Sequence, residues 1–144
     1  MRFTVLVAVF AGYGGLLFGL TLFPTSAGLI PEAERLRPYP LQTTAMFLRL
    51  GGWQMLVNVA GNLLAFMPLG FLWPLLRPGS TRAWRVVWLA ASVSLLIETL
   101  QYFSGRRFAD VDDILLNALG GLLGYGAYRV CMLARAGRCL TAES

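Results

Sequence analysis

The chain has 144 residues, of which 57% are hydrophobic and 13% charged, and its mean hydropathy is +0.64. This composition excludes an ordinary soluble globule and indicates an integral membrane protein. The net charge of +5 comes from 12 arginines without any lysine. Because these arginines form no long run interleaved with aromatic residues, we expect no nucleic-acid partner.

Four apolar segments predict an all-α integral membrane protein, a four-helix bundle made by one domain over residues 1–144. Each segment has about the 20 residues that a helix needs to cross the hydrocarbon core. The expected spans are residues 3–23, 53–76, 84–103 and 114–133. A secretory signal is the alternative for the first segment, because Arg2 precedes it and Thr25-Ser26-Ala27 resembles a cleavage site. The segment is long for a signal, which favours a retained span.

The first two expected spans contain small residues and a proline that affect helix packing and shape. In the first span, Ala11, Gly15 and Gly19 recur at every fourth residue and predict a face that a neighbouring helix approaches closely. In the second span, Pro68 removes one backbone hydrogen bond and is expected to kink the helix, with Gly70 easing the bend.

The longest polar segment, residues 24–52, predicts a loop outside the bilayer, because it contains four prolines and charges of both signs. Its last part, residues 41–50, mixes threonines with large apolar side chains. Such a mixture favours a short helix lying in the membrane interface.

The arginines are distributed unevenly between the two ends of the expected bundle. Seven of them fall at the end that holds the termini: Arg2, Arg77, Arg82, Arg85, Arg129, Arg135 and Arg138. The other five fall at the opposite end, where five acidic residues dilute them: Arg35, Arg37, Arg49, Arg106 and Arg107. Because cytoplasmic loops are enriched in basic residues, we expect both termini in the cytoplasm and both longer loops outside.

Polar side chains collect at the outer ends of three expected spans. At a rise of about 1.5 Å per residue, Glu98 and Asn58 lie about 7.5 Å below the outer edge. A carboxylate near a helix centre costs roughly 2.5–3.5 kcal/mol on insertion scales, so Glu98 is expected to face the bundle interior and meet partners there. The sequence therefore predicts a polar cup in the outer-leaflet half of the bundle. Its candidate ligand-binding residues are Asn58, Asn62, Glu98, Gln101, Arg106, Arg107, Asp110, Asp112, Asp113 and Asn117.

Two plainer interpretations stay open. The asparagines could form side-chain hydrogen bonds that hold the spans together. Asp112 or Asp113 could cap the fourth helix, since acids just before a helix accept from its free N–H groups and favour its dipole. Neither interpretation explains why so many polar side chains collect at one end of a bundle whose other half carries almost no polar group besides arginine.

Two motifs carry a resemblance to a known family. The first is Asn58-x3-Asn62-x3-Phe66-x-Pro68-x-Gly70, and the second is Glu98-x2-Gln101-x5-Arg107-x2-Asp110-x-Asp112-Asp113-x3-Asn117-x2-Gly120-x3-Gly124. With Leu22-Phe23-Pro24 at the end of the first span, they resemble the VanZ-like family of bacterial membrane proteins over nearly the whole chain. The loop departs from many members, because Arg37-Pro38-Tyr39-Pro40 replaces an Asn-Leu-x-Pro-Phe-like stretch.

The resemblance implies a small multi-pass helical protein of the bacterial plasma membrane. The named member of the family is associated with low-level resistance to the glycopeptide teicoplanin, without an established reaction. The first hypothesis is therefore a binding protein. Arg106 and Arg107 would pair with a phosphate or carboxylate of a lipid headgroup, a lipid-linked cell-wall precursor or a glycopeptide.

The second hypothesis is an enzyme acting at the outer leaflet. The chain has no histidine, which removes the commonest general base and the imidazole metal ligand. The remaining chemistry is carboxylate acid–base work by Glu98 or Asp113, with a divalent metal held by Asp110, Asp112, Asp113 and Asn117. A third hypothesis is a structural subunit whose partner chain fills the cup. We favour binding because the sequence shows no activated nucleophile.

The expected topology predicts a simple labelling result. Single cysteines are introduced at Ser104 and at Ser80, in a chain whose own cysteines are replaced by serine. An impermeant thiol reagent applied to intact cells is expected to label the cysteine at Ser104 and to spare the one at Ser80. Labelling at Ser80 alone would reverse the topology.

Overall fold

The computed structural model describes residues 2–22, 29–77, 82–105 and 108–141. It consists mainly of helices, and four of them are long and apolar enough to cross a membrane, which confirms the expected all-α membrane bundle. The four candidate spans are Phe3–Leu22, Leu56–Leu76, Ala83–Ser104 and Val111–Ala136. The protein is thus a multi-pass membrane protein by the length and composition of its helices.

The spans belong to helices that start and end close to the expected positions. The long helices are α1 (Arg2–Leu22), α4 (Gly61–Leu76), α5 (Ala83–Ser104) and α6 (Val111–Thr141). The second span begins in a short helix α3 (Gly52–Met55) and a π-helical turn η2 (Leu56–Ala60) before α4. This turn is an irregularity that the sequence did not predict, and it lies ahead of Pro68, through which α4 continues.

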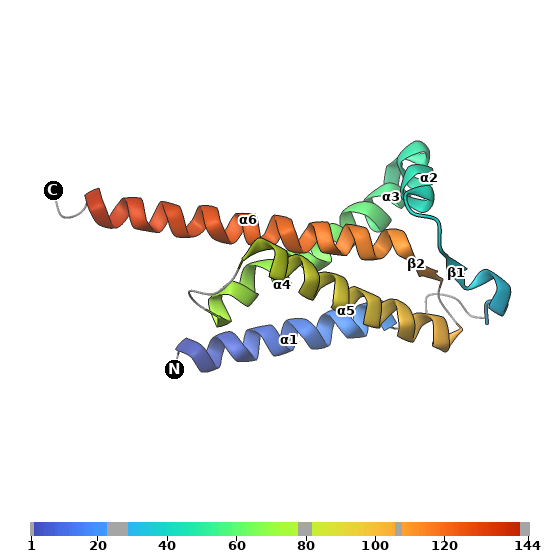
Figure 1. Ribbon diagram of the computed structural model, residues 1–144, viewed down its shortest axis with the longest axis horizontal. Coiled ribbons are helices and arrows are strands. Elements are labelled where there is room, and N and C mark those ends of the chain that lie inside the picture. The colour runs from blue at the N-terminus through green and yellow to red at the C-terminus, as the bar shows by residue number, and fades with distance from the viewer. Residues whose placement is uncertain (1, 23–28, 78–81, 106–107, 142–144) are drawn as a thin grey trace.

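Both termini lie at one end of the bundle, and the segment before the second span meets the segment before α6 at the other end (Figure 1). At that polar end, a 3-10 turn η1 (Glu32–Glu34) leads into strand β1 (Leu36–Arg37), which is followed by helix α2 (Gln42–Leu50). Strand β2 (Ala109–Asp110) precedes α6 and pairs with β1 in parallel, so that Arg37 lies opposite Asp110.

Helix α6 packs most extensively against α4, and glycines make the close contact possible. A Cβ added to Gly120 or Gly124 would overlap the backbone carbonyl of Leu63 or Met67 on α4. A Cβ added to Gly70 would likewise overlap the carbonyl of Gly121. The small residues therefore let two helix backbones touch, as in other membrane helix pairs, and Gly70 serves this contact.

Helix α1 joins the bundle through a different face from the one expected. The Tyr13 hydroxyl donates to the carbonyl of Ala65 on α4 at 2.6 Å, and Leu17 belongs to the buried core. Ala11 and Gly15 are exposed, and a Cβ added to Gly15 would meet no atom within 4 Å. The predicted small-residue packing face is therefore wrong at these two positions. The residues of the proposed signal cleavage site, 25–27, lie outside the described residues.

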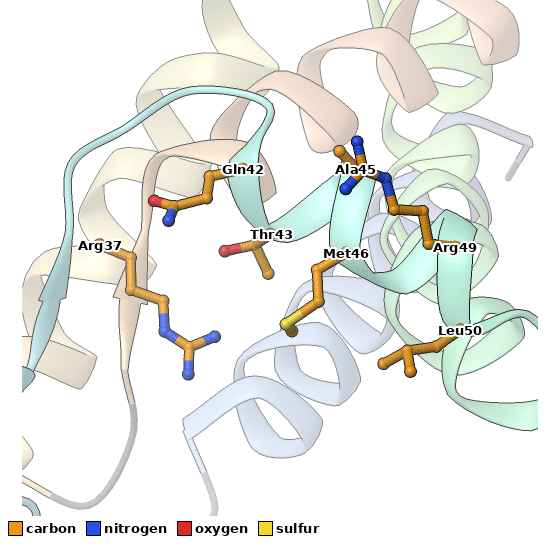
Figure 2. Close-up of a pocket in the computed structure, with 7 residues that line it drawn as sticks. All are labelled: Arg37, Gln42, Thr43, Ala45, Met46, Arg49 and Leu50. Atoms are coloured by element: carbon orange, nitrogen blue, oxygen red, sulfur yellow. The ribbon is translucent and has the colours of Figure 1, made fainter.

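Helix α2 confirms the short helix expected within residues 41–50. It has no buried residue, and it stands beside β1 with side chains of both elements facing a shared space (Figure 2). The pairing of β1 with β2 was not predicted, because strands of two residues carry no hydrophobic period.

The contact between α4 and α6 predicts a large difference between two glycines on the same helix. Gly124→Ala is expected to destabilise the folded protein by about 1–3 kcal/mol, because the new methyl group forces the two backbones apart. Gly126→Ala is the matched control, because a Cβ there meets no atom within 4 Å. Thermal unfolding in detergent, followed by size-exclusion chromatography, measures both. Equal unfolding temperatures for the two variants would contradict the close contact.

Candidate functional site

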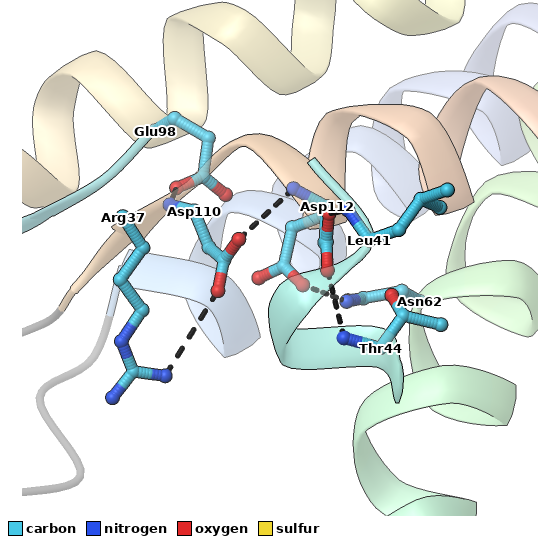
Figure 3. Close-up of polar contacts among 8 residues, drawn as sticks. Arg37, Leu41, Thr44, Asn62, Glu98, Asp110 and Asp112 are labelled. Carbon is cyan, nitrogen blue, oxygen red and sulfur yellow. Dashed lines mark hydrogen bonds and ion pairs between the residues drawn. The ribbon is translucent and has the colours of Figure 1, made fainter. Parts of the chain in front are cut away.

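The carboxylates at the polar end of the bundle bind the protein's own backbone (Figure 3). The Oε2 atom of Glu98 accepts a hydrogen bond from the N–H of Asp110 at 2.7 Å. The Oδ1 atom of Asp110 accepts from the N–H of Asp112 at 2.9 Å, so Asp110 caps the first turn of α6. The cap of this helix is therefore neither of the two residues expected for it, and the helix starts three residues before the expected span.

Asp112 caps a helix other than its own. Its carboxylate is 1% exposed and accepts hydrogen bonds from the N–H of Leu41 and, at 2.7 Å, from the N–H of Thr44. These two residues lie at the start of α2, where backbone N–H groups have no partner within the helix. Leu41 has no side-chain oxygen that could cap the helix, and its φ of 66° is unusual for a residue other than glycine. Asp112 thus fixes α2 to the end of α6.

Amide side chains connect the spans directly. Asn62 on α4 donates to Oδ1 of Asp113 at 2.5 Å, and Asn117 on α6 donates to the Ser94 hydroxyl of α5 at 2.8 Å. Gln101 on α5 donates to the carbonyl of Thr21 on α1 at 2.8 Å. These contacts correspond to the plainer interpretation of side-chain bonds between spans.

The expected site residues that the structure describes differ in how far they are buried. Eight of the ten are described, and Glu98, Gln101, Asp110, Asp112 and Asn117 are at most 5% exposed. Asn58 is half-buried within the π-helical turn η2. Arg106 and Arg107 lie outside the described residues. The buried carboxylates form an internal network of hydrogen bonds, and binding of a ligand by these residues stays a prediction.

Arg37 is a site residue that the sequence analysis did not select. Its guanidinium lies 3.9 Å from Oδ2 of Asp110 and 4.1 Å from the centre of the Phe108 ring, a cation–π contact. Its side chain is 38% exposed. The parallel pairing of β1 with β2 brings Arg37 to this position, and a two-residue pairing leaves no signal in the sequence.

A cavity of about 750 Å³ opens between Arg37 and one face of α2 (Figure 2). We call it the basic cavity; its lining residues are Arg37, Gln42, Thr43, Ala45, Met46, Arg49 and Leu50. Two of these residues are arginines and none is acidic. Within the described part of the chain, Arg49 has no ion pair or hydrogen-bond partner for its guanidinium. The basic cavity therefore carries positive charge that the described residues do not fully compensate.

A second, smaller cavity of about 270 Å³ lies between α5 and α6, next to the strand pair. We call it the apolar groove; it is lined by Leu36, Leu95, Glu98, Thr99, Tyr102, Ala109, Asp110, Val111 and Ile114. Most of these side chains are apolar, and the two carboxylates among them are each 5% exposed.

The acidic residues point to different partners. Asp110 binds its own helix and Arg37, Asp112 binds α2, and Asp113 binds Asn62. Across the described residues, no group of three histidine, cysteine or acidic side chains is placed to hold a metal ion. The divalent cation at Asp110, Asp112, Asp113 and Asn117 belongs to the alternative enzyme hypothesis and stays untested.

A family model matches residues 10–133, which include both motifs of the polar end. The chain belongs to the VanZ/LLP1 family. The resemblance found in the sequence is thereby confirmed. No curated protein and no solved structure matches the chain. For this VanZ/LLP1 protein, the residues of the polar end are therefore the basis on which a function is proposed.

The cap supplied by Asp112 predicts a local change on mutation. Loss of a helix cap costs about 1–2 kcal/mol, so Asp112→Ala is expected to speed amide exchange at the start of α2 by roughly 5- to 30-fold. Asp113→Ala is the matched control, because its carboxylate binds a side chain of α4 and lies one residue away. Hydrogen–deuterium exchange of residues 41–46 measures both. Unchanged exchange in Asp112→Ala would contradict the cap.

Proposed function

We propose that this VanZ/LLP1 protein binds an anionic amphiphile of the cell envelope at the membrane interface, with the anionic group in the basic cavity. The observation that carries this proposal is the lining of the basic cavity, in which Arg37 and Arg49 face a space of about 750 Å³ without an acidic neighbour in the lining. Guanidinium groups match the oxygens of phosphates and carboxylates, and they are weakly hydrated, so they bind such anions well at an interface.

The helix that carries Arg49 also suits the membrane interface. Met46, Leu48 and Leu50 on α2 are between 45% and 61% exposed, so their apolar side chains are available to lipid. A helix that combines exposed apolar side chains with a basic residue lies in the headgroup region, where anionic groups are found. The basic cavity is thus at the depth of the group that it is proposed to bind.

Three ligands share this chemistry: a lipid headgroup, a lipid-linked cell-wall precursor and an acidic glycopeptide. Each combines an anionic group with an apolar part. In this proposal the polar end faces the outside of a bacterial plasma membrane, both termini are cytoplasmic, and binding contributes to teicoplanin resistance. Arg106 and Arg107 precede Phe108 in the sequence and would add positive charge to the same end.

The buried carboxylates have a positioning role in this function. Asp112 holds α2, and Asp110 lies 3.9 Å from Arg37. Both walls of the basic cavity therefore depend on the network beneath it. Glu98 supports the same arrangement through the backbone of Asp110.

Neutral replacements of the two arginines test the proposal. Arg37→Gln with Arg49→Gln is expected to weaken binding of dioctanoyl-phosphatidic acid by at least about tenfold, since a hydrogen bond to a charged group contributes about 1.5–3 kcal/mol. Titration of the purified protein, followed by native mass spectrometry, measures the affinity. High salt is expected to weaken binding by the wild-type chain, because both partners are charged and partly exposed.

Arg135→Gln is the control for this experiment, because Arg135 is exposed near the far end of α6. It is expected to bind the lipid as the wild type does. Equal affinity of the double variant and the wild type would contradict the proposed site. In cells, the double variant is expected to lose any teicoplanin resistance that expression of the wild type confers, at equal protein levels.

A further inference from the structure

The basic cavity and the apolar groove meet at one ion pair. Arg37 lines the basic cavity, and Asp110, whose Oδ2 lies 3.9 Å from the Arg37 guanidinium, lines the apolar groove. Leu36 and Arg37 follow each other in β1, and successive side chains of a strand point to opposite faces. Leu36 lines the groove while Arg37 lines the cavity, and on β2 both Ala109 and Asp110 line the groove. Strand β1 is therefore the partition between the two spaces.

The apolar groove lies at a depth that molecules dissolved in the membrane reach. Leu95 is nine residues before the end of α5 at Ser104, about 14 Å along the helix axis. Leu95 is 57% exposed and Thr99 is also exposed, so the groove opens on the side that lipid contacts. An occupant of the groove therefore comes from the bilayer.

Size and charge restrict the occupant further. A volume of about 270 Å³ with a mostly apolar lining matches a segment of an alkyl or isoprenoid chain. Among the described residues, the lining contains no basic side chain that could pair with an anion, so the part of a ligand that enters the groove carries no negative charge.

We infer that the apolar groove holds the first part of the hydrocarbon chain of the same amphiphile whose anionic group binds in the basic cavity. This inference rests on the proposed function and narrows its ligand to a lipid phosphate, one hydrocarbon chain of which crosses β1 at Leu36 and Arg37. The anionic group lies on the arginine side of the partition. The chain enters on the leucine side, between α5 and α6, where the described lining has no basic side chain for the anionic group. The basic cavity thus binds the anionic group and the apolar groove binds the adjoining hydrocarbon chain of one molecule.

Photolabelling of the full chain in phosphatidylcholine vesicles tests this inference. The probe is hexadecyl phosphate with a diazirine within the first four carbons of its chain, and the comparison probe is the matching uncharged alcohol. The phosphate probe is expected to label the peptide that contains Leu95 and Tyr102 at least fivefold more than the alcohol does. Equal labelling by the two probes would overturn the inference, because the groove would then bind any chain independently of the basic cavity.

Obstruction of the groove gives a second measurement. Leu95→Trp and Thr99→Trp place a large ring at the exposed mouth and are each expected to reduce labelling of Tyr102 at least fivefold. Both positions are exposed, so the larger side chain leaves the core unchanged. Leu96→Trp is the matched control, because Leu96 is 50% exposed and does not line the groove. Unchanged labelling of Tyr102 in both groove variants would overturn the inference.

The same double variant distinguishes failure of the inference from failure of the proposed function. Arg37→Gln with Arg49→Gln is expected to lower groove labelling by the phosphate probe to the level of the alcohol. If this variant loses binding of dioctanoyl-phosphatidic acid but keeps the wild-type labelling, the proposed function stands and the shared ligand is overturned. If it binds dioctanoyl-phosphatidic acid as the wild type does, the proposed function itself fails, and the inference fails with it.

Discussion

The polar end of this protein depends on one buried carboxylate that caps a helix distant in sequence. Asp112 accepts from backbone N–H groups that lie 68 and 71 residues earlier in the chain. Helix α2 buries none of its own residues and has no cap of its own, so its position relies on this contact more than on packing. A charged acceptor at a helix N-terminus is stabilised by the hydrogen bonds and by the helix dipole together. Without that contact, the basic cavity has only one fixed wall.

Acidic and basic side chains form two layers at this end. Glu98, Asp110 and Asp112 are buried, and each accepts from a backbone N–H. Arg37 and Arg49 face the cavity above them. A buried backbone N–H without a hydrogen-bond partner costs several kcal/mol, about as much as in lipid. By accepting from these N–H groups, the carboxylates remove this cost where the loops meet the bundle. Positive charge remains at the surface, where an anion can reach it.

Local features of the sequence were enough to predict much of the fold. Hydropathy predicted four spans, because apolar residues continue along each helix. The spacing of small residues was a weaker signal and failed for Ala11 and Gly15, since small residues allow a close contact but do not show that a neighbour is present.

The candidate site was less predictable, because its decisive contacts join distant segments. An aspartate near a helix start has the same appearance in the sequence whether it caps that helix or another one. Arg37 reaches the site through the pairing of β1 with β2, and strands of two residues show no hydrophobic period in the sequence. The family motifs did mark the correct end of the bundle, and Asn62, Asp110 and Asp112 within them all take part in the network.

The strand pair also constrains the order in which the protein is completed during synthesis. Strand β1 emerges before the second span, but its partner β2 follows the third span, so the first loop stays unfinished until residue 110 has been made and the third span inserted. Chains grow from the N-terminus, and early segments wait for later ones. A chain that ends after α5 would contain most residues of both cavities and yet lack Asp112 and β2. The polar end is thus completed last, after all four spans have been made.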